Sequence, residues 1–235
     1  MATESTGSGG RLLAAIEGLG WPAVGQSSLG RPIRAAELAA GAAPWLVVGG
    51  VHGDEPASVE AVLDLIAGGV TPPRGLWVMP ALNPDGIERG TKNSATDVDL
   101  NRNFAAANFT TAHRPGYDPG ARPLSEPETR ALAELVDRVR PAGVVAVHAP
   151  FACINHDGPA AAWAAAVAAA SGWPARADIG YPTPGSLGSW LGVDRGVPVL
   201  TIELPAGAYA DFRAPALAAL RAAVGFALPA ARAHG

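Results

Sequence analysis

The sequence is poor in charged residues. They make up 16% of its 235 residues, whereas hydrophobic residues make up 49%. Soluble domains typically contain roughly 25% charged residues. The low share indicates a well-buried core and argues against a disordered chain or a protein that coats nucleic acid. The net charge of -4 favours no class of partner.

The sequence also lacks the features of disulfide-stapled, exported and membrane proteins. Cys153 is the only cysteine, so no internal disulfide can form, and a reducing compartment suits the chain. No apolar run approaches membrane-spanning length, and residues 1–10 lack the basic start and apolar stretch of an export signal. We therefore expect a cytoplasmic protein that does not associate with membranes.

Motifs of several other function classes are missing. No Gly-x-Ser-x-Gly elbow occurs, which disfavours a serine hydrolase. No phosphate-binding glycine-rich motif or basic, aromatic strip occurs, so we expect no nucleotide and no nucleic acid as a partner. A thiol site made of Cys153 and His148 is disfavoured, because nucleophile and base usually converge from distant segments.

Short runs rich in Val, Leu and Ile alternate with helix-like stretches. The predicted strands are residues 45–51, 76–80, 144–147 and 197–203. The predicted helices are residues 58–67, 126–140, 159–170 and 214–227. This alternation predicts an α/β fold: a single domain with a mixed, mostly parallel, twisted sheet that has helices on both faces.

The domain boundaries and one helix start can also be predicted. Residues 1–25 are expected to be a mobile lead-in, and residues 26–235 the main domain, with a functional loop region between Asn83 and Ser125. Ser125 and Glu128 fit a capping box at the start of the helix predicted from residue 126, and basic residues follow at its end.

Polar side chains follow each predicted strand. A histidine and a carboxylate lie close together in Gly49-Gly50-Val51-His52-Gly53-Asp54-Glu55, directly after the first strand. In parallel sheets, ligands bind beyond the carboxyl ends of the strands. The groups expected at this rim are His52, Glu55, residues 83–86, His148 and Glu203. Two histidines and one glutamate form a recurrent catalytic zinc site, so the pattern predicts a zinc hydrolase.

A second polar block covers residues 97–104. Arg102 is suited to bind a substrate carboxylate through two hydrogen bonds, and Asn101 offers another donor. Asp99 is placed to accept the other ring N–H of His52. Taken alone, the block also fits a solvated turn stabilised by its Asp and Asn side chains.

Together, these motifs resemble the carboxypeptidase A-type zinc metallocarboxypeptidase family. The resemblance rests on the order and spacing of His52-x-x-Glu55, Asn83-Pro-Asp-Gly86, residues 98–104, His148 and Glu203. Within that family, four stretches resemble the murein peptide amidases, which cleave the γ-D-glutamyl-diaminopimelate bond of cell-wall peptides. They are residues 125–129, 148–154, 180–186 and 201–205.

The resemblance implies a zinc carboxypeptidase-like fold and one zinc ion per chain. The implied zinc ligands are His52, Glu55 and His148. It also implies that Glu203 is the general base. The implied substrate is a small peptide with a free carboxylate, and neither the resemblance nor the sequence indicates an oligomeric state.

The resemblance assigns the remaining roles less completely. Asn101 and Arg102 match the pair that holds the substrate carboxylate, and Asp99 matches the partner of the first histidine. The family has an arginine that stabilises the oxyanion. Here Lys92 aligns with it, and Arg89 lies nearby. A lysine offers one mobile charge where an arginine offers a rigid fork.

Substrate contacts beyond the carboxylate are open to more than one interpretation. Asp157 is a candidate partner for the side-chain ammonium of diaminopimelate, although it also fits an exposed loop residue. Tyr181 and Tyr209 are candidates for the family's mobile active-site tyrosine. Two alternative functions remain: a zinc acylase of the succinylglutamate desuccinylase and aspartoacylase kind, and a non-catalytic zinc- or peptide-binding protein.

Overall fold

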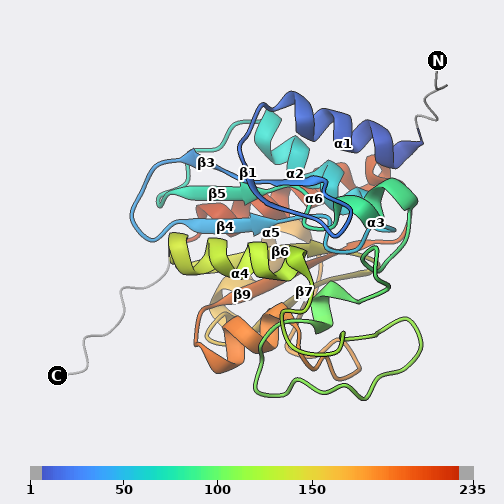
Figure 1. The fold of residues 1–235 in the computed structure, drawn as a ribbon. Coiled ribbons are helices and arrows are strands. Elements are labelled where there is room, and N and C mark those ends of the chain that lie inside the picture. The colour runs from blue at the N-terminus through green and yellow to red at the C-terminus, as the bar shows by residue number, and fades with distance from the viewer. Residues whose placement is uncertain (1–6, 228–235) are drawn as a thin grey trace.

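A seven-stranded sheet runs through the computed structural model, which describes residues 7–227 (Figure 1). Its strands are β3 (Ala36–Ala39), β4 (Trp45–Val48), β5 (Leu76–Met79), β6 (Gly143–His148), β7 (Phe151–Asp157), β8 (Ala175–Arg176) and β9 (Val199–Pro205). Their spatial order is β3-β5-β4-β6-β9-β7-β8. The central strands β5, β4, β6 and β9 are parallel, whereas β3 and β7 pair antiparallel with β5 and β9. The predicted mixed, mostly parallel sheet is confirmed.

Helices cover both faces of this sheet. Helices α2 (Pro56–Ala67), α5 (Ala161–Ser171) and α6 (Tyr209–Gly225) lie on one face. The other face is covered by α4 (Pro127–Val139), by the π-helix η2 (Gly188–Asp194) and by the two-stranded sheet of β1 (Ala23–Gln26) and β2 (Pro32–Arg34). In Figure 1, α4 lies in front of the sheet and α5 and α6 lie behind it.

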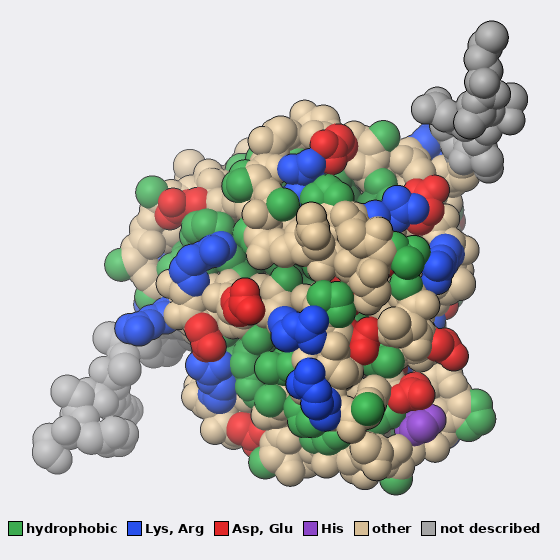
Figure 2. All heavy atoms as spheres, in the orientation of Figure 1, with side chains coloured by type: hydrophobic (Ala, Val, Ile, Leu, Met, Phe, Trp, Pro, Cys, Tyr) green, Lys and Arg blue, Asp and Glu red, His purple; other side chains and the backbone are tan. Residues whose placement is uncertain are grey.

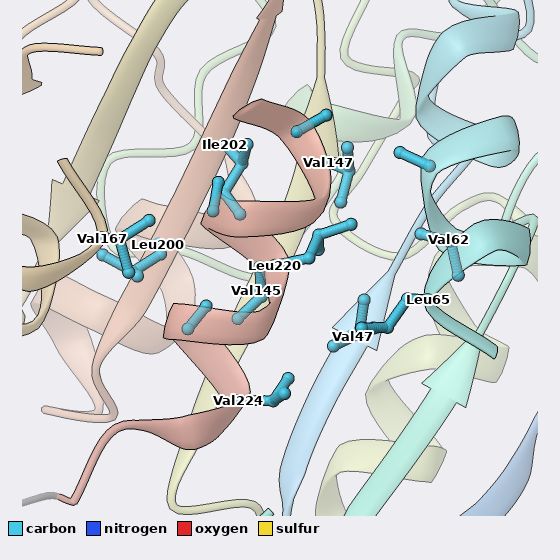
Figure 3. Close-up of a cluster of buried hydrophobic side chains, with 14 of the residues drawn as sticks. Val47, Val62, Leu65, Val145, Val147, Val167, Leu200, Ile202, Leu220 and Val224 are labelled. Atoms are coloured by element: carbon cyan, nitrogen blue, oxygen red, sulfur yellow. The ribbon is translucent and has the colours of Figure 1, made fainter. Parts of the chain in front are cut away.

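The burial of the central strands on both faces explains why their sequences are continuous apolar runs. Along β4, Trp45 and Val47 pack toward α2 and α6, whereas Leu46 and Val48 pack toward α4. All four are fully buried. Figure 3 shows the first of these layers, in which strand side chains meet Leu220 and other apolar side chains of the helices. A strand covered on both faces needs apolar residues at every position.

All four predicted strands and all four predicted helices are present. The largest shift is in α6, which begins at Tyr209 instead of residue 214. The predicted start lies next to Pro215, a residue type that suits the first turn of a helix. In the structure an earlier turn precedes it, and the two parts meet at a non-helical Phe212 (φ -130°, ψ 19°).

The predicted capping box is wrong. The N-cap of α4 is Glu126, and its side chain makes no capping hydrogen bond. Glu128 is instead fully buried and accepts a hydrogen bond from the backbone N–H of Ser28 (2.8 Å). The Asn103 side chain accepts from the Glu126 N–H (3.2 Å). Tertiary contacts therefore replace the local cap.

Part of the expected lead-in is packed structure. Helix α1 (Ser8–Gly18) places Ile16 against Val59 of α2 and Ile87 of α3 (Pro84–Arg89). The boundary predicted at residue 25 lies inside β1. Residues 1–6 of the lead-in and residues 228–235 lie outside the described range.

Two surface properties bear on partners. Among residues 7–227, no helix combines the length and apolar character needed to cross a membrane. Basic and acidic side chains are interspersed over the face that Figure 2 draws.

The packing around α6 leads to a stability prediction. Leu220 is fully buried in the layer shown in Figure 3, so Leu220→Ala should lower the free energy of unfolding by about 2–5 kcal/mol. Leu29 is 56% exposed, and Leu29→Ala should change it by about 0.5 kcal/mol or less. Urea denaturation of both variants measures the difference. Equal effects would contradict the assigned core.

Candidate metal centre and active site

The candidate site lies at the carboxyl ends of three adjacent parallel strands. His52 and Glu55 follow β4, His148 ends β6, and Glu203 lies near the end of β9. Strand β6 pairs with both β4 and β9, and His148 is directly opposite Glu203 in the register. The sheet therefore brings together residues from position 52 to position 203, as the strand-end argument predicts.

Three side chains converge with the geometry of a metal site. The Nδ1 atoms of His52 and His148 are 3.3 Å apart. The Glu55 carboxylate lies 2.7 Å from the first of these atoms and 3.2 Å from the second. Two nitrogens bound to one tetrahedral zinc ion at about 2.0–2.1 Å are themselves about 3.3 Å apart. The arrangement fits zinc, and all three potential ligand atoms lie within 4.8 Å of one another.

The electrostatics of these side chains also favour a cation. Burial alone would lower the pKa of His52, but the Glu55 and Asp99 carboxylates outweigh burial and raise it to about 9. Burial alone would raise the pKa of Glu55, but His148 and His52 lower it to about 2. The pocket thus stabilises positive charge beside the Glu55 carboxylate. A divalent cation can take the place of the proton that the raised pKa favours on His52.

Close backbone packing positions the two ligands that follow β4. A Cβ atom on Gly53 would overlap the backbone carbonyl of Gly86. The Ser58 hydroxyl donates to the Glu55 carbonyl (2.7 Å) and accepts from the Gly50 N–H (3.1 Å). Glycine is therefore needed at position 53 for close approach to a second backbone segment.

Asp99 connects the metal centre to the rest of the site. It is fully buried, and one carboxylate oxygen lies 3.1 Å from His52 Nε2. The other oxygen accepts from Lys92 Nζ (2.6 Å). Burial alone would raise the pKa of Asp99, but His52, Arg102 and Lys92 hold it well below its usual range. Asp99 therefore orients His52 as a carboxylate.

The two candidates for the oxyanion cation occupy different places. Lys92 lines the metal cavity, where its Nζ donates to the Gly116 carbonyl (3.0 Å) and lies 3.5 Å from the centroid of the Tyr117 ring. Arg89 is exposed at the end of α3, contacts the Ala95 carbonyl (3.5 Å) and lines other hollows. The left-handed Gly90 ends α3 between the two cations, and Arg89 is not among the residues that line the metal cavity.

A cavity of about 200 Å³ borders the three ligands. Arg102 and Asn101 line it, and Arg102 is 5% exposed although it is charged. Its guanidinium donates to the Asn101 carbonyl (2.6 Å). The Asn101 side-chain oxygen accepts from the Leu187 N–H (3.0 Å), which leaves its NH₂ group as a donor. A buried arginine beside an amide donor is suited to bind a carboxylate.

Glu203 lines the same cavity and has a free oxygen. The Phe151 N–H donates a hydrogen bond to its carboxylate, but Oε2 has no hydrogen-bond partner among the described residues. Burial raises the pKa of Glu203, an effect that His148 opposes and Glu55 reinforces. Buried carboxylate oxygens without partners are rare. This oxygen can accept a proton from a molecule bound in the cavity.

Asp157 does not lie in this cavity, which corrects the expectation that it contacts substrate. Strand β7 runs antiparallel to β9, so Asp157 pairs with Val199 at the opposite end of the strand from Glu203. Its carboxyl group packs against Gly188 of η2. The sequence placed Asp157 close to His148 along the chain, but the direction of β7 carries it away from the rim.

The structure places the candidate tyrosines and adds one that we had not predicted. Tyr181 lines the metal cavity and accepts a hydrogen bond from Arg102. Tyr209 instead donates to Asp64 (2.9 Å), between α6 and α2. Tyr117 also lines the cavity. Tyr117 precedes His148 and lies in the loop region between Asn83 and Ser125 that the sequence marks as functional, and this position is the signal that could have identified it.

Comparisons with known proteins agree with this geometry. The model of the zinc carboxypeptidase family matches residues 22–157. The chain is 39% identical to murein peptide amidase A of Escherichia coli strain K12, over 77% of this chain and 79% of the relative. It is 34% identical to murein peptide amidase A of Vibrio campbellii, over 68% of each chain.

Solved structures show the same fold. The murein-tripeptide amidase MpaA of Escherichia coli O157 superposes with a TM-score of 0.76 at 34% identity, covering 88% of this chain and 92% of that one. Bovine thrombin-activatable fibrinolysis inhibitor also gives a TM-score of 0.76, covering 92% of this chain and 93% of that one. Its identity is only 18%, so this likeness concerns the fold alone.

The close approach at Gly53 leads to a prediction about metal binding. Gly53→Ala should push the loop that carries His52 away from Gly86, lower the zinc content and destabilise the fold by about 1–3 kcal/mol. Gly10→Ala is the matched control, because a Cβ on Gly10 meets nothing within 4 Å. Zinc analysis and thermal melting of both variants measure the effect. A Gly53→Ala protein with full zinc and unchanged melting would contradict it.

Proposed function

Because the chain belongs to the zinc carboxypeptidase family, we propose that it is a zinc-dependent amidase that releases diaminopimelate from γ-D-glutamyl-diaminopimelate in cell-wall peptides. The reaction class follows from the family, whose members are zinc-dependent hydrolases. The substrate is proposed from the murein peptide amidase relatives and from the motifs shared with them.

One observation carries the proposal. The free carboxylate oxygen of Glu203 borders the same cavity of about 200 Å³ as the potential zinc ligands and the buried Arg102. A proton acceptor, a metal site and a carboxylate-binding group are the three parts that hydrolysis of a carboxyl-terminal amide requires.

His52, Glu55 and His148 are the proposed ligands of one zinc ion per chain. When bound to two histidines and one glutamate, zinc supplies a Lewis acid that polarises a carbonyl group and lowers the pKa of water to about 7. Asp99 keeps the His52 ring oriented for this role through the contact with Nε2.

The remaining side chains bind the peptide and move the proton. Arg102 and Asn101 hold the terminal carboxylate and so place the scissile amide beside Glu203. Glu203 takes a proton from the attacking water and delivers it to the leaving amine, a role that typically contributes about 10²–10⁴-fold. Lys92 stabilises the negative charge that develops on the carbonyl oxygen, for which a single donor is worth about 2.7–4 kcal/mol.

The proposal includes recycling of imported cell-wall peptides in the cytoplasm. The buried, free thiol of Cys153 suits a reducing compartment. Activity measured in separated cell fractions tests this location.

The first prediction from the proposal concerns substrate and metal. The purified protein should release diaminopimelate from L-Ala-γ-D-Glu-diaminopimelate, a chelator should abolish release, and added zinc should restore it. Release that persists without metal would contradict the metal mechanism. Chelator-sensitive cleavage of N-succinylglutamate, with none of the peptide, would support the acylase alternative.

The second prediction concerns the proposed base. Glu203→Gln keeps the size of the side chain and removes its ability to accept the proton, so kcat should fall by about 10²–10⁴-fold while zinc content stays unchanged. Glu37→Gln is the matched control, because Glu37 is exposed on β3. Steady-state kinetics and zinc analysis of both variants test the role, and full turnover by Glu203→Gln would refute it.

A further inference from the structure

A second, larger cavity of about 470 Å³ adjoins the metal cavity. The two share Arg102, Tyr117 and Tyr181 as lining residues. The walls of the second cavity come from the loop before α4 and from the loop before η2, which lie side by side at the lower right of Figure 1. A group bound by Arg102 therefore has open space on both sides: the metal centre on one and this cavity on the other.

Arg114 is the distinctive residue of the second cavity. Its guanidinium lies 4.0 Å from the ring centroid of Tyr117 and 4.8 Å from that of Tyr181. The two rings contact each other edge to face, with centroids 6.3 Å apart. Within the described part of the chain, no carboxylate forms an ion pair with Arg114, although its neighbour His113 has Asp118 at 3.9 Å. The aromatic rings thus hold a guanidinium whose donors are free for a ligand.

The charge of the lining is positive. Arg102 and Arg114 contribute to it, and no aspartate or glutamate is among the lining residues. A cavity walled by two guanidinium groups and tyrosines favours an anionic group and disfavours a cationic one. The positive lining therefore indicates that a side chain ending in an anionic group fits this cavity.

We propose that this cavity receives the side chain of the residue that is released, and that Arg114 binds a second carboxylate at the end of that side chain. The inference rests on the proposed function. Arg102 holds the first carboxylate at the wall shared by the two cavities, so the side chain of the same residue extends into the larger one. The guanidinium fork of Arg114 matches a carboxylate in geometry and charge.

This assignment makes Arg114 a specificity-determining residue. Diaminopimelate ends in a carboxylate and an ammonium group on one carbon, whereas lysine ends in an ammonium group alone. Arg114 is exposed on its loop, so the ammonium group of diaminopimelate can remain in water while the carboxylate binds. Lysine would place an unpaired cation beside a fixed one, which selects against it.

The test compares two substrates that differ only in that carboxylate. L-Ala-γ-D-Glu-diaminopimelate and L-Ala-γ-D-Glu-L-Lys are given to the unsubstituted protein and to Arg114→Met. The unsubstituted protein should prefer the first by about 10- to 100-fold in kcat/KM, the range expected for one hydrogen-bonded charge pair. Arg114→Met should lose most of this preference by slowing hydrolysis of the diaminopimelate peptide, and its kcat/KM for the lysine peptide should not fall.

Two further variants separate the charge from its geometry and from the loop. Arg114→Lys keeps the charge without the fork and should recover only part of the preference. Arg122→Met makes the same change as Arg114→Met at an exposed position of the same loop that does not line the cavity, and it should behave like the unsubstituted protein.

The possible failures are distinguishable. If Arg114→Met keeps the full preference for the diaminopimelate peptide, the role of Arg114 is overturned while the proposed function stands. An unsubstituted protein that cleaves both peptides equally would also overturn this role. If it cleaves neither peptide, the proposed function fails, and the inference built on it fails as well.

Discussion

The buried carboxylate of Asp99 contacts three separate parts of the candidate active site and holds them in place relative to one another. It contacts His52 Nε2 with one oxygen and the Lys92 ammonium with the other, and it also accepts from the Asn101 N–H (2.9 Å). A proposed metal ligand, the proposed oxyanion cation and the start of the segment proposed to bind the substrate carboxylate are therefore fixed by one group. Because a buried carboxylate without such donors is costly, these contacts depend on one another.

The site divides its work between two cavities that share one wall. The metal cavity contains the groups proposed to break the amide, and the larger cavity contains Arg114, which we propose selects the released residue. Tyr117 contacts the cations of both, because Lys92 and Arg114 lie 3.5 and 4.0 Å from its ring centroid. Tyr117, Tyr181 and Arg102 line both cavities. In the proposed mechanism, Arg102 orients the peptide for both recognition and catalysis.

Predictions from the sequence succeeded where an apolar run or the ends of parallel strands sufficed, and failed where the outcome depended on which distant segment a side chain contacts. Apolar runs were enough to find the central strands, since strands buried on both faces must be apolar throughout. The Ser125 and Glu128 pattern looked like a local cap, but the Glu128 carboxylate instead accepts a hydrogen bond from the backbone N–H of the distant Ser28. Asp157 lies close to His148 along the chain, but the antiparallel strand β7 places it at the opposite end of β9 from Glu203.

The sequence by itself determined the fold class, the family and the residues that can bind a metal, because these depend on residue type, order and spacing. Only the tertiary structure decided that Lys92 and not Arg89 lies beside the metal ligands, and that Tyr117 and Arg114 complete the walls. The physical reason is that cation–aromatic contacts and buried ion pairs form between loops whose paths are set by packing. No periodicity in the sequence encodes those paths.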